Sequence, residues 1–199
     1  MKVFGKWDVE DVQISDISLA NHITLEGRRI PHTFGRRAAG NLEKSSLNII
    51  ERLTNKVMRS GQGKRKLSGK YIRGRGSCGK KLQAMRIVEG AFEIIERETK
   101  ENPIQILVRA IENAGPREDI TRIKRGGISY TVSVDVSPVR RVDESLKNLA
   151  LSAFSSSFNK KVSAEEALAK EIMLAAKEDN TSFSIKRRDE VERIAKSSR

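Results

Sequence analysis

The chain has 199 residues, enough for one ordinary domain with an extension and for a sizeable core. Its 39 lysines and arginines against 26 acidic residues leave a formal net charge of +13. Such a surplus is usually offset by a polyanion, either nucleic acid or an anionic membrane. No run approaches the roughly 20 apolar residues that span a membrane, and the first residues lack the apolar core of a signal peptide, so we expect no membrane partner.

Cysteine and histidine are too scarce for several classes of site. Cys78 is the only cysteine, which excludes an internal disulfide and favours a reducing, cytoplasmic setting. Two histidines, His22 and His32, without any CxxC pair argue against a metal site. Both lie in an irregular region, where they are poorly placed to activate a nucleophile. We therefore expect no metal, no cofactor and no enzymatic activity.

The first residues differ from the rest of the chain in charge. Residues 1–27 contain two lysines against five acidic residues, whereas the remainder is strongly basic. The imperfect alternation of this lead segment predicts short extended pieces. Its acidic charge ahead of a basic body indicates an extension with contacts of its own, and we expect these contacts to be to protein. A basic arm without acidic residues follows, and we expect it to bind RNA through its four arginines, which are Arg28, Arg29, Arg36 and Arg37. The predicted division is an extension and basic arm over 1–41 and a helical RNA-binding domain over 42–199.

Apolar residues then recur with the helical period. They predict a first helix over 42–59 and a second from about residue 80 to residue 102. Asn102 followed by Pro103 is typical of an N-cap with proline in the first turn, and this pair predicts the start of the third helix. Gly115 and Pro116 end that helix.

The stretch between the first two helices is rich in glycine and in positive charge. From Arg59 to Lys81 it has nine basic residues, six glycines and no acid, so we expect a flexible loop that wraps polymer phosphates. The candidate contacts are Lys64, Arg65, Lys66, Lys70, Arg73, Arg75, Lys80 and Lys81.

Part of this loop, "GRGSCGKK", also resembles a nucleotide-binding loop. Lys81 stands where such a loop needs a serine or threonine, and no buried strand precedes it, so a phosphate-loop nucleotide-binding enzyme is the weaker alternative. A solvated loop without any ligand also remains open.

The segment over about 118–136 changes to the alternating pattern of strands. Gly126 and Gly127 can take the positive φ angles of a type I′ turn, so the sequence predicts a β-hairpin. Arg122, Lys124 and Arg125 lie near its tip, a suitable shape for contacting nucleic acid. The alternatives are a ribbon whose cations only protect its edges, and a DNA-binding ribbon protein.

Three helices complete the chain. Arg140 and Arg141 lie at the start of the fourth, Ser163 and Glu166 form a capping box at the start of the fifth, and Lys186 and Arg187 open the last. Cations at a helix N-terminus oppose the helix dipole, so an external anion is expected there. The predicted fold is mainly α, a six-helix bundle with a protruding basic β-hairpin between the third and fourth helices. With 5% aromatic residues, structured RNA read through its phosphates fits better than a single-strand stacking platform.

Several stretches taken together resemble one known family. With the segments "GKKLQAMRIVEGAFEII" and "NPIQILVRAIENAGPREDITRIKRGGISYTVSVDVSPVRRVDESL" and the ending "IKRRDEVERIAKSSR", the chain resembles small-subunit ribosomal protein seven. The opening "FGKWDVEDVQISDISL" is similar to the archaeal and eukaryotic branch. The glycine-rich loop is longer than the short basic turn of most family members, so the resemblance assigns no role to residues 64–79.

That resemblance implies a structural protein without catalytic activity. It implies direct binding to the 3′ major domain of small-subunit rRNA, assembly of the subunit head, and a hairpin near the exit site, close to mRNA and tRNA. Lys80, Lys81, Arg140 and Arg141 are expected to face rRNA, and the cations beside the Gly126-Gly127 turn are expected near the exit site. The implied protein partners are small-subunit proteins nine and eleven, and no homo-oligomer is expected.

Overall fold

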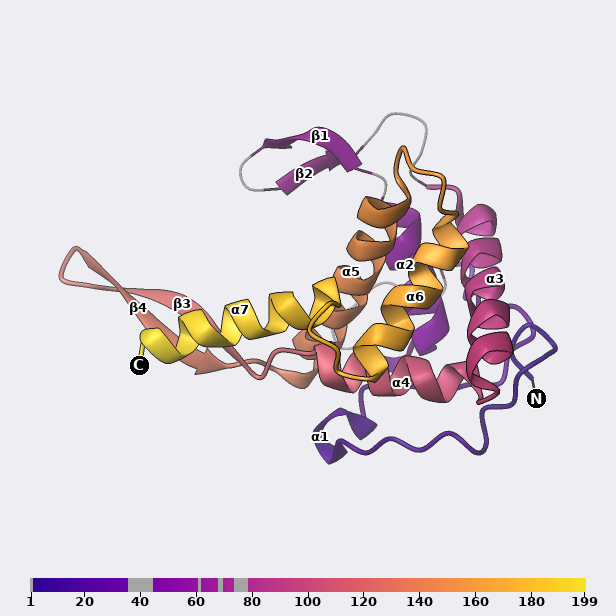
Figure 1. The fold of residues 1–199 in the computed structure, drawn as a ribbon. Coiled ribbons are helices and arrows are strands. Elements are labelled where there is room, and N and C mark those ends of the chain that lie inside the picture. Colours follow the sequence, from indigo (N-terminus) through magenta and orange to yellow (C-terminus); the bar gives the residue numbers. More distant parts are fainter. Residues whose placement is uncertain (1, 36–44, 61, 68–69, 74–78) are drawn as a thin grey trace.

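A computed structural model describes residues 2–35, 45–60, 62–67, 70–73 and 79–199. The described chain is mainly helical, as predicted, and also contains two separate two-stranded antiparallel sheets (Figure 1). Its helices are α1 (Ile17–Ala20), α2 (Ile49–Ser60), α3 (Lys81–Thr99), α4 (Pro103–Ala114), α5 (Pro138–Ser157), α6 (Ala164–Ala176) and α7 (Phe183–Ser197). Its strands are β1 (Gln62–Leu67), β2 (Lys70–Arg73), β3 (Glu118–Arg125) and β4 (Ile128–Asp135).

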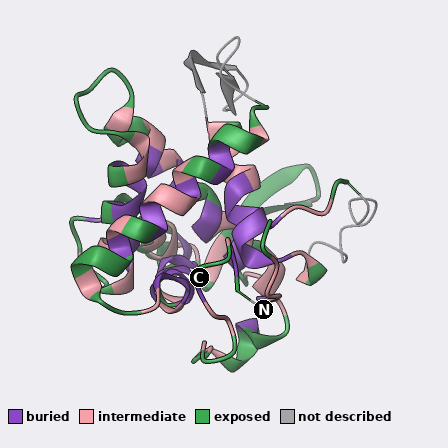
Figure 2. Ribbon diagram, turned by 90° about the vertical axis from the view of Figure 1, so that its right-hand side faces the viewer, coloured by how far each residue is buried: buried purple, intermediate pink, exposed green. Residues whose placement is uncertain are grey.

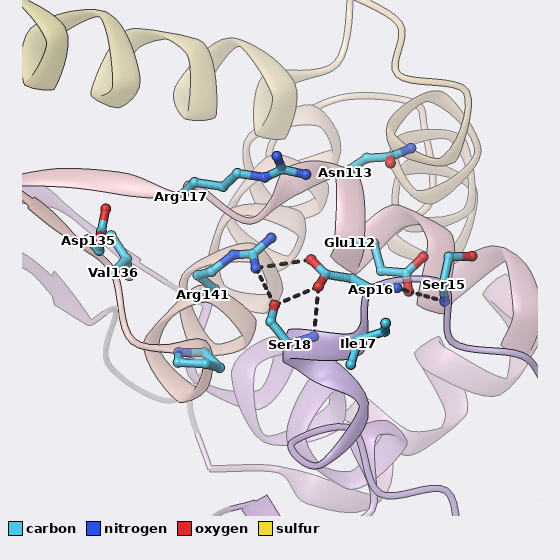
Figure 3. A pocket seen from close by; sticks show the side chains of 11 residues that line it. Ser15, Asp16, Ile17, Ser18, Glu112, Asn113, Arg117, Asp135, Val136 and Arg141 are labelled. Atoms are coloured by element: carbon cyan, nitrogen blue, oxygen red, sulfur yellow. Dashed lines mark hydrogen bonds and ion pairs between the residues drawn. The ribbon is translucent and has the colours of Figure 1, made fainter.

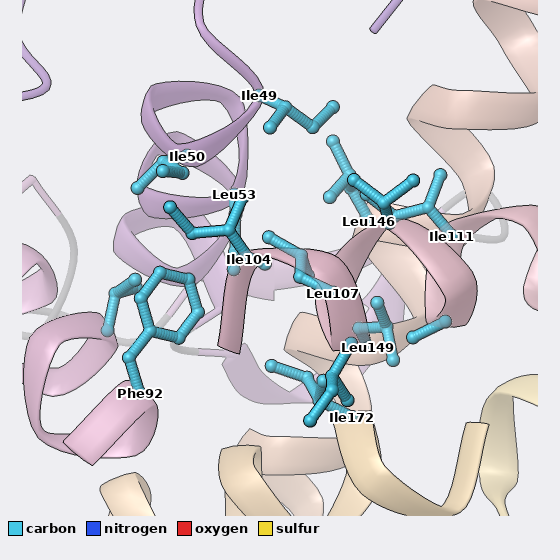
Figure 4. Close-up of a cluster of buried hydrophobic side chains, with 14 of the residues drawn as sticks. Ile49, Ile50, Leu53, Phe92, Ile104, Leu107, Ile111, Leu146, Leu149 and Ile172 are labelled. Carbon is cyan, nitrogen blue, oxygen red and sulfur yellow. The ribbon is translucent and has the colours of Figure 1, made fainter. Parts of the chain in front are cut away.

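The helices enclose one hydrophobic core. Helix α6 packs against α3, α4 and α5, while α2 packs against α3 and α5. Figure 4 shows Leu53, Phe92, Leu107, Leu149 and Ile172 directed toward one another, and all five are fully buried. Each such side chain contributes about 1.5–3 kcal/mol relative to leaving it in water. In Figure 2 the buried residues of these helices, in purple, lie toward the centre of the helical body.

The caps predicted from sequence are present. The Asn102 side chain accepts a hydrogen bond from the backbone N of Ile104 (3.0 Å) ahead of Pro103. Ser163 and Glu166 form the complete capping box at the start of α6. These caps satisfy backbone N–H groups that a helix start leaves unpaired, which is why the two boundaries were predictable.

Other sequence predictions differ from the structure. The first long helix begins at Ile49 and not at residue 42, because Asn48 accepts a hydrogen bond from the backbone N of Ile50 (3.0 Å) and starts the helix there. Helix α1 forms in the lead segment, capped by Asp16, where only extended pieces were expected. The described residues therefore form seven helices, not six.

The stretch between α2 and α3 also differs from expectation. A flexible loop was predicted, but strands β1 and β2 pair antiparallel within it, with Lys66 opposite Tyr71 and Leu67 opposite Lys70. Pairing of this kind satisfies backbone hydrogen bonds without requiring an apolar core, which the composition of this stretch could not supply. The prediction was wrong for these two strands.

The lead segment packs on its own helical body. Trp7 is 4% exposed and meets Phe92 edge to face, with ring centroids 5.5 Å apart, while its Nε1 donates to Glu96 (3.0 Å). Val3 and Leu19 are also buried in the core. Residues 1–27 thus contribute side chains to the core, and the proposed boundary at residue 41 lies outside the described residues.

Strands β3 and β4 form the predicted hairpin, which lies between α4 and α5 and projects from the body (Figure 1). Arg125 pairs with Ile128, so two residues form the turn, and Gly126 and Gly127 have φ angles of +55° and +84°. Both angles are those of a type I′ turn, which glycine adopts without strain. Helix α7 lies along the base of the hairpin, where Arg199 forms an ion pair with Glu118.

Candidate nucleic-acid interface

The hairpin separates its side chains into two faces. Arg122 and Lys124 lie on one face, opposite Thr131 and Ser129 of the partner strand, and both cations are exposed. In the described part of the chain neither has an ion-pair partner. Successive residues of a strand point to opposite sides, so the other face carries apolar residues, among them Ile123. The first face therefore offers two unpaired cations beside two hydroxyl groups, a combination suited to phosphate oxygens.

Two adjacent arginines at the start of α5, both predicted to contact RNA, differ in their exposure. Arg140 is exposed and forms an ion pair with Asp119 (2.7 Å) at the base of the hairpin. Arg141 is only 6% exposed. Its Nη1 donates to Asp16 (3.0 Å) and to the Ser18 hydroxyl (2.9 Å), as Figure 3 shows. The expectation that Arg141 faces RNA needs correction, because its guanidinium is enclosed and holds the lead segment to α5.

The Asp16 carboxylate is the anchor of this contact. It accepts hydrogen bonds from the Ser18 hydroxyl (2.6 Å) and from the backbone N of Ser18 (2.9 Å). These bonds and the neighbouring Arg141 hold the pKa of Asp16 below its usual range, although burial opposes them. Glu112 of α4 accepts from the backbone N of Ser15 (2.7 Å) and Asp16 (2.9 Å), so the lead segment is tied to two helices at one point.

Lys80 and Lys81 also differ in their surroundings. Lys80, which precedes α3, is exposed. Lys81 donates to the buried Glu51 of α2 (2.6 Å), which also accepts from the backbone N of Thr33 (3.0 Å). Burial raises the pKa of Glu51, but Lys81 and the Thr33 N–H outweigh it and hold the pKa below its usual range. Lys81 is therefore a structural cation, which corrects its assignment as an RNA contact, and Lys80 alone is directed outward.

The remaining predicted contacts have varied surroundings. Arg28 pairs with Glu26 (2.8 Å) and is half-buried, whereas Arg29 is exposed. Lys186 and Arg187 are exposed on the first turns of α7, and Arg187 forms an ion pair with Glu190. The predicted contacts that are described and exposed thus lie on the arm, on the hairpin, before α3, at the start of α5 and on α7.

Several predicted contacts fall where the structure gives no side chain. Arg36, Arg37 and Arg75 lie outside the described residues. Only the backbone is described for Arg125 and for the residues on β1 and β2, which are Lys64, Arg65, Lys66, Lys70 and Arg73.

Sequence reasoning missed a buried charge network. Arg52 of α2 is 4% exposed, donates to the backbone O of His22 (2.8 Å) and pairs with Asp143 (3.4 Å), which Lys56 also approaches (3.3 Å). Burial lowers the pKa of Arg52. Burial also raises the pKa of Asp143, but the positive charges of Lys56 and Arg52 have the larger effect and hold that pKa below its usual range. Nothing in the helical period distinguishes Arg52 from a surface arginine, so this role had no signal in the sequence.

Several exposed cations lie outside the predicted contacts, among them Arg117, Lys160 and Lys161. Arg117 precedes the hairpin, and Lys160 and Lys161 lie in the connection between α5 and α6. The adjacent lysine pair was the available signal, since it occurs in a stretch without acidic residues.

Metal and membrane sites find no support in the described part of the chain. It contains no group of three or more potential metal ligands. None of its helices is long and apolar enough to cross a membrane. A helical body with an exposed cationic ribbon defines the class as a basic nucleic-acid-binding protein.

Comparison with known proteins gives the family. The family model described as ribosomal protein S7p/S5e matches residues 22–199, so the chain belongs to this family. The resemblance inferred from the motifs is confirmed, and the chain is a ribosomal protein with a structural role and not an enzyme.

Three archaeal relatives show how far the similarity extends, and each is named small ribosomal subunit protein uS7. The protein of Methanothermobacter thermautotrophicus is 49% identical, over 98% of this chain and 97% of its own length. Those of Methanothrix thermoacetophila and Picrophilus torridus are 47% and 45% identical, over 100% and 99% of this chain and 100% and 98% of their own lengths. The shared region therefore includes nearly all of the lead segment, whose first 21 residues precede the match to the family model.

Proposed function

We propose that this chain is a structural constituent of the small ribosomal subunit, in the cytoplasm, and that it binds the 3′ major domain of small-subunit rRNA directly. In this role it organises assembly of the subunit head. Family membership, the relatives' names and the net charge of +13 support the proposal. A chain with this surplus of positive charge is stabilised when phosphates neutralise it.

The hairpin carries the proposal most directly. Arg122 and Lys124 are exposed on one face of a ribbon that projects from the body, and neither is paired within the described chain (Figure 1). A cation with an intramolecular role is enclosed and also meets an acid, as Arg141 does. The hairpin, with its Gly126-Gly127 turn, lies near the exit site, by mRNA and tRNA.

Other exposed cations extend the proposed contact surface. Arg29, Lys80, Arg140, Lys186 and Arg187 are the remaining predicted contacts whose side chains are described and exposed. The predicted contacts of the basic arm and of the β1–β2 region join them. The protein partners are small-subunit proteins nine and eleven, and the protein acts as a single copy.

The β1–β2 hairpin weighs against the nucleotide-loop alternative. A phosphate loop needs a buried strand that leads directly into a helix, so that backbone N–H groups converge on one phosphate cluster. Here the preceding strand, β2, belongs to a separate two-stranded antiparallel sheet.

Co-sedimentation with small ribosomal subunits tests the proposal. We expect the full chain to remain with the subunits after a high-salt wash. A competition assay at physiological salt complements it, with small-subunit rRNA against duplex DNA of equal length. Loss of the chain from washed subunits would contradict the proposal. Preference for the DNA would contradict it too and would favour a DNA-binding ribbon protein.

A further inference from the structure

A cavity of about 330 Å³ lies where the ends of four helices meet. The last turns of α2 and α5 and the first turns of α3 and α6 surround it. Met58, Ile87 and Phe154 supply apolar walls, and Gln83 and Lys80 stand at its polar side. Its size is at the lower end of the range for ligand pockets, about 300–1,000 Å³, so it suits a compact group.

The surroundings of this cavity are cationic. Lys80 is exposed, and the connection between α5 and α6 carries the exposed Lys160 and Lys161. None of the three has an ion-pair partner in the part of the chain that the structure describes. Of the two acids at the start of α6, Glu166 is held in the capping box and Glu165 lies against Gly90 of α3. An apolar cavity lined by the unpaired Lys80, with two further lysines in the connection between two of its helices, fits a ligand that combines a flat apolar ring with a negative charge.

Aromatic side chains continue the apolar surface outward. The rings of Phe154 and Phe158 are stacked, with centroids 5.1 Å apart and planes at 28°, and Phe158 is 54% exposed. Gln83 is exposed, and its amide makes no hydrogen bond in the described part of the chain, so both its donor and its acceptor are free. Aromatic rings bind unstacked bases, and an amide can read the hydrogen-bonding edge of a base.

We propose that this cavity receives one unpaired base of the bound RNA. The base lies against Phe154, Gln83 contacts its edge, and Lys80 binds the adjoining phosphate. This inference rests on the proposed function, because it names how the same RNA is held at one point. It adds an apolar contact, independent of salt, to an interface otherwise made of phosphate contacts.

A matched pair of variants tests the cavity. Ser157 lines it, and its hydroxyl bonds only to carbonyls of its own helix. Ser157→Leu therefore narrows the cavity beside Phe154 without leaving a buried group unpaired. Ser156→Leu places the same side chain on the exposed neighbouring position, outside the cavity. Helical circular dichroism and the melting temperature establish that both variants fold.

Binding to a small-subunit rRNA transcript is then measured at several salt concentrations. We expect Ser157→Leu to weaken binding about tenfold or more, the effect of losing one stacked base, with the salt slope unchanged. Ser156→Leu is expected to bind like the wild type. Lys80→Ala is expected to reduce the salt slope by about 0.7–0.9, as for one phosphate. Unchanged binding by Ser157→Leu would overturn the inference and leave the cavity to a protein partner.

Ultraviolet cross-linking of the wild-type complex locates the base. Mass spectrometry is expected to find a nucleotide adduct on the peptide that contains Phe154, and Ser157→Leu is expected to abolish it. If the complex forms without this adduct, the proposed base contact is wrong, whereas the proposed function still holds. If the wild-type chain fails to bind the transcript at all, the proposed function fails, and this inference fails with it.

Discussion

The cations of the helical body and those of the β3–β4 hairpin have different surroundings. In the body, Arg52, Lys81 and Arg141 are largely enclosed, and each meets a carboxylate of another segment. On the hairpin, Arg122 and Lys124 are exposed, and no acid of the described chain pairs with them. The enclosed cations join segments distant in sequence, whereas the exposed ones leave their charge available to a partner.

This difference shows that positive charge in the sequence alone does not distinguish an exposed cation from an enclosed one. Arg140 and Arg141 are neighbours in sequence, yet one is exposed and the other is 6% exposed. Removing one member of a buried ion pair lowers the free energy of unfolding strongly, because the other member is left without a partner. Exposed charges contribute little to this free energy. Variants of the two kinds therefore separate folding from binding.

The largest effect on stability is expected where the lead segment enters the core. Trp7→Ala removes a ring that is 4% exposed and packs on Phe92. We expect the free energy of unfolding to fall by about 3–5 kcal/mol, as for other buried aromatic residues. Urea denaturation measures it. A change below about 1 kcal/mol would show that residues 1–27 do not belong to the folded body.

The buried charge network gives the next largest effect. Arg52→Met keeps most of the side-chain volume but removes the bonds to the His22 carbonyl and to Asp143. We expect a loss of about 2–3 kcal/mol in the free energy of unfolding. The control is Arg109→Met, since Arg109 pairs with Glu101 at an exposed position, and it is expected to cost no more than about 0.5 kcal/mol. Equal losses of unfolding free energy in the two variants would contradict the claim that enclosed cations stabilise the fold more than exposed ones.

The dependence of stability on pH tests the carboxylates of these enclosed ion pairs together. The pKa values of Asp16, Glu51 and Asp143 are held below their usual range in the folded chain. A group with a lowered folded pKa stabilises the fold above its unfolded pKa, about 4, and this stability is lost as pH falls through the folded pKa. We expect the free energy of unfolding to be nearly constant from pH 7 to pH 5 for these groups and to fall below about pH 4. Asp143→Asn is expected to flatten that fall, and an unchanged acid profile would contradict the assignment.

The smallest effect on stability is expected on the hairpin. Arg122→Gln combined with Lys124→Gln removes two exposed charges and leaves the apolar face intact. The free energy of unfolding is expected to change by less than about 0.5 kcal/mol. Thermal melting beside the wild type measures this change. A large loss of stability would mean that these cations support the fold and are not reserved for a partner.

Much of the fold was predictable because its signals are local. The caps at Asn102 and Ser163 and the Gly126-Gly127 turn each follow from a few adjacent residues. The β1–β2 pairing escaped prediction because the sequence of its two strands has no alternating apolar pattern.

The candidate interface was less predictable, because it depends on contacts between distant segments. Arg141 meets Asp16, and Lys81 meets Glu51, through packing that no local pattern encodes. The sequence identified where cations are abundant, but only the fold separated those used internally from those left exposed. The lead segment illustrates the same limit, since its acidic residues indicated a partner and the structure shows Asp16 bound to α5.

The salt dependence of binding to small-subunit rRNA tests the central claim most directly. If about six phosphates are neutralised, the slope of log affinity against log salt is expected to be roughly −4 to −5 for the wild type. The Arg122→Gln, Lys124→Gln variant is expected to reduce this slope by about 1.4–1.8, and Arg109→Gln to leave it unchanged. A wild-type slope near zero, or equal slopes for the wild type and the hairpin variant, would contradict the claim that the exposed cations of the hairpin hold RNA.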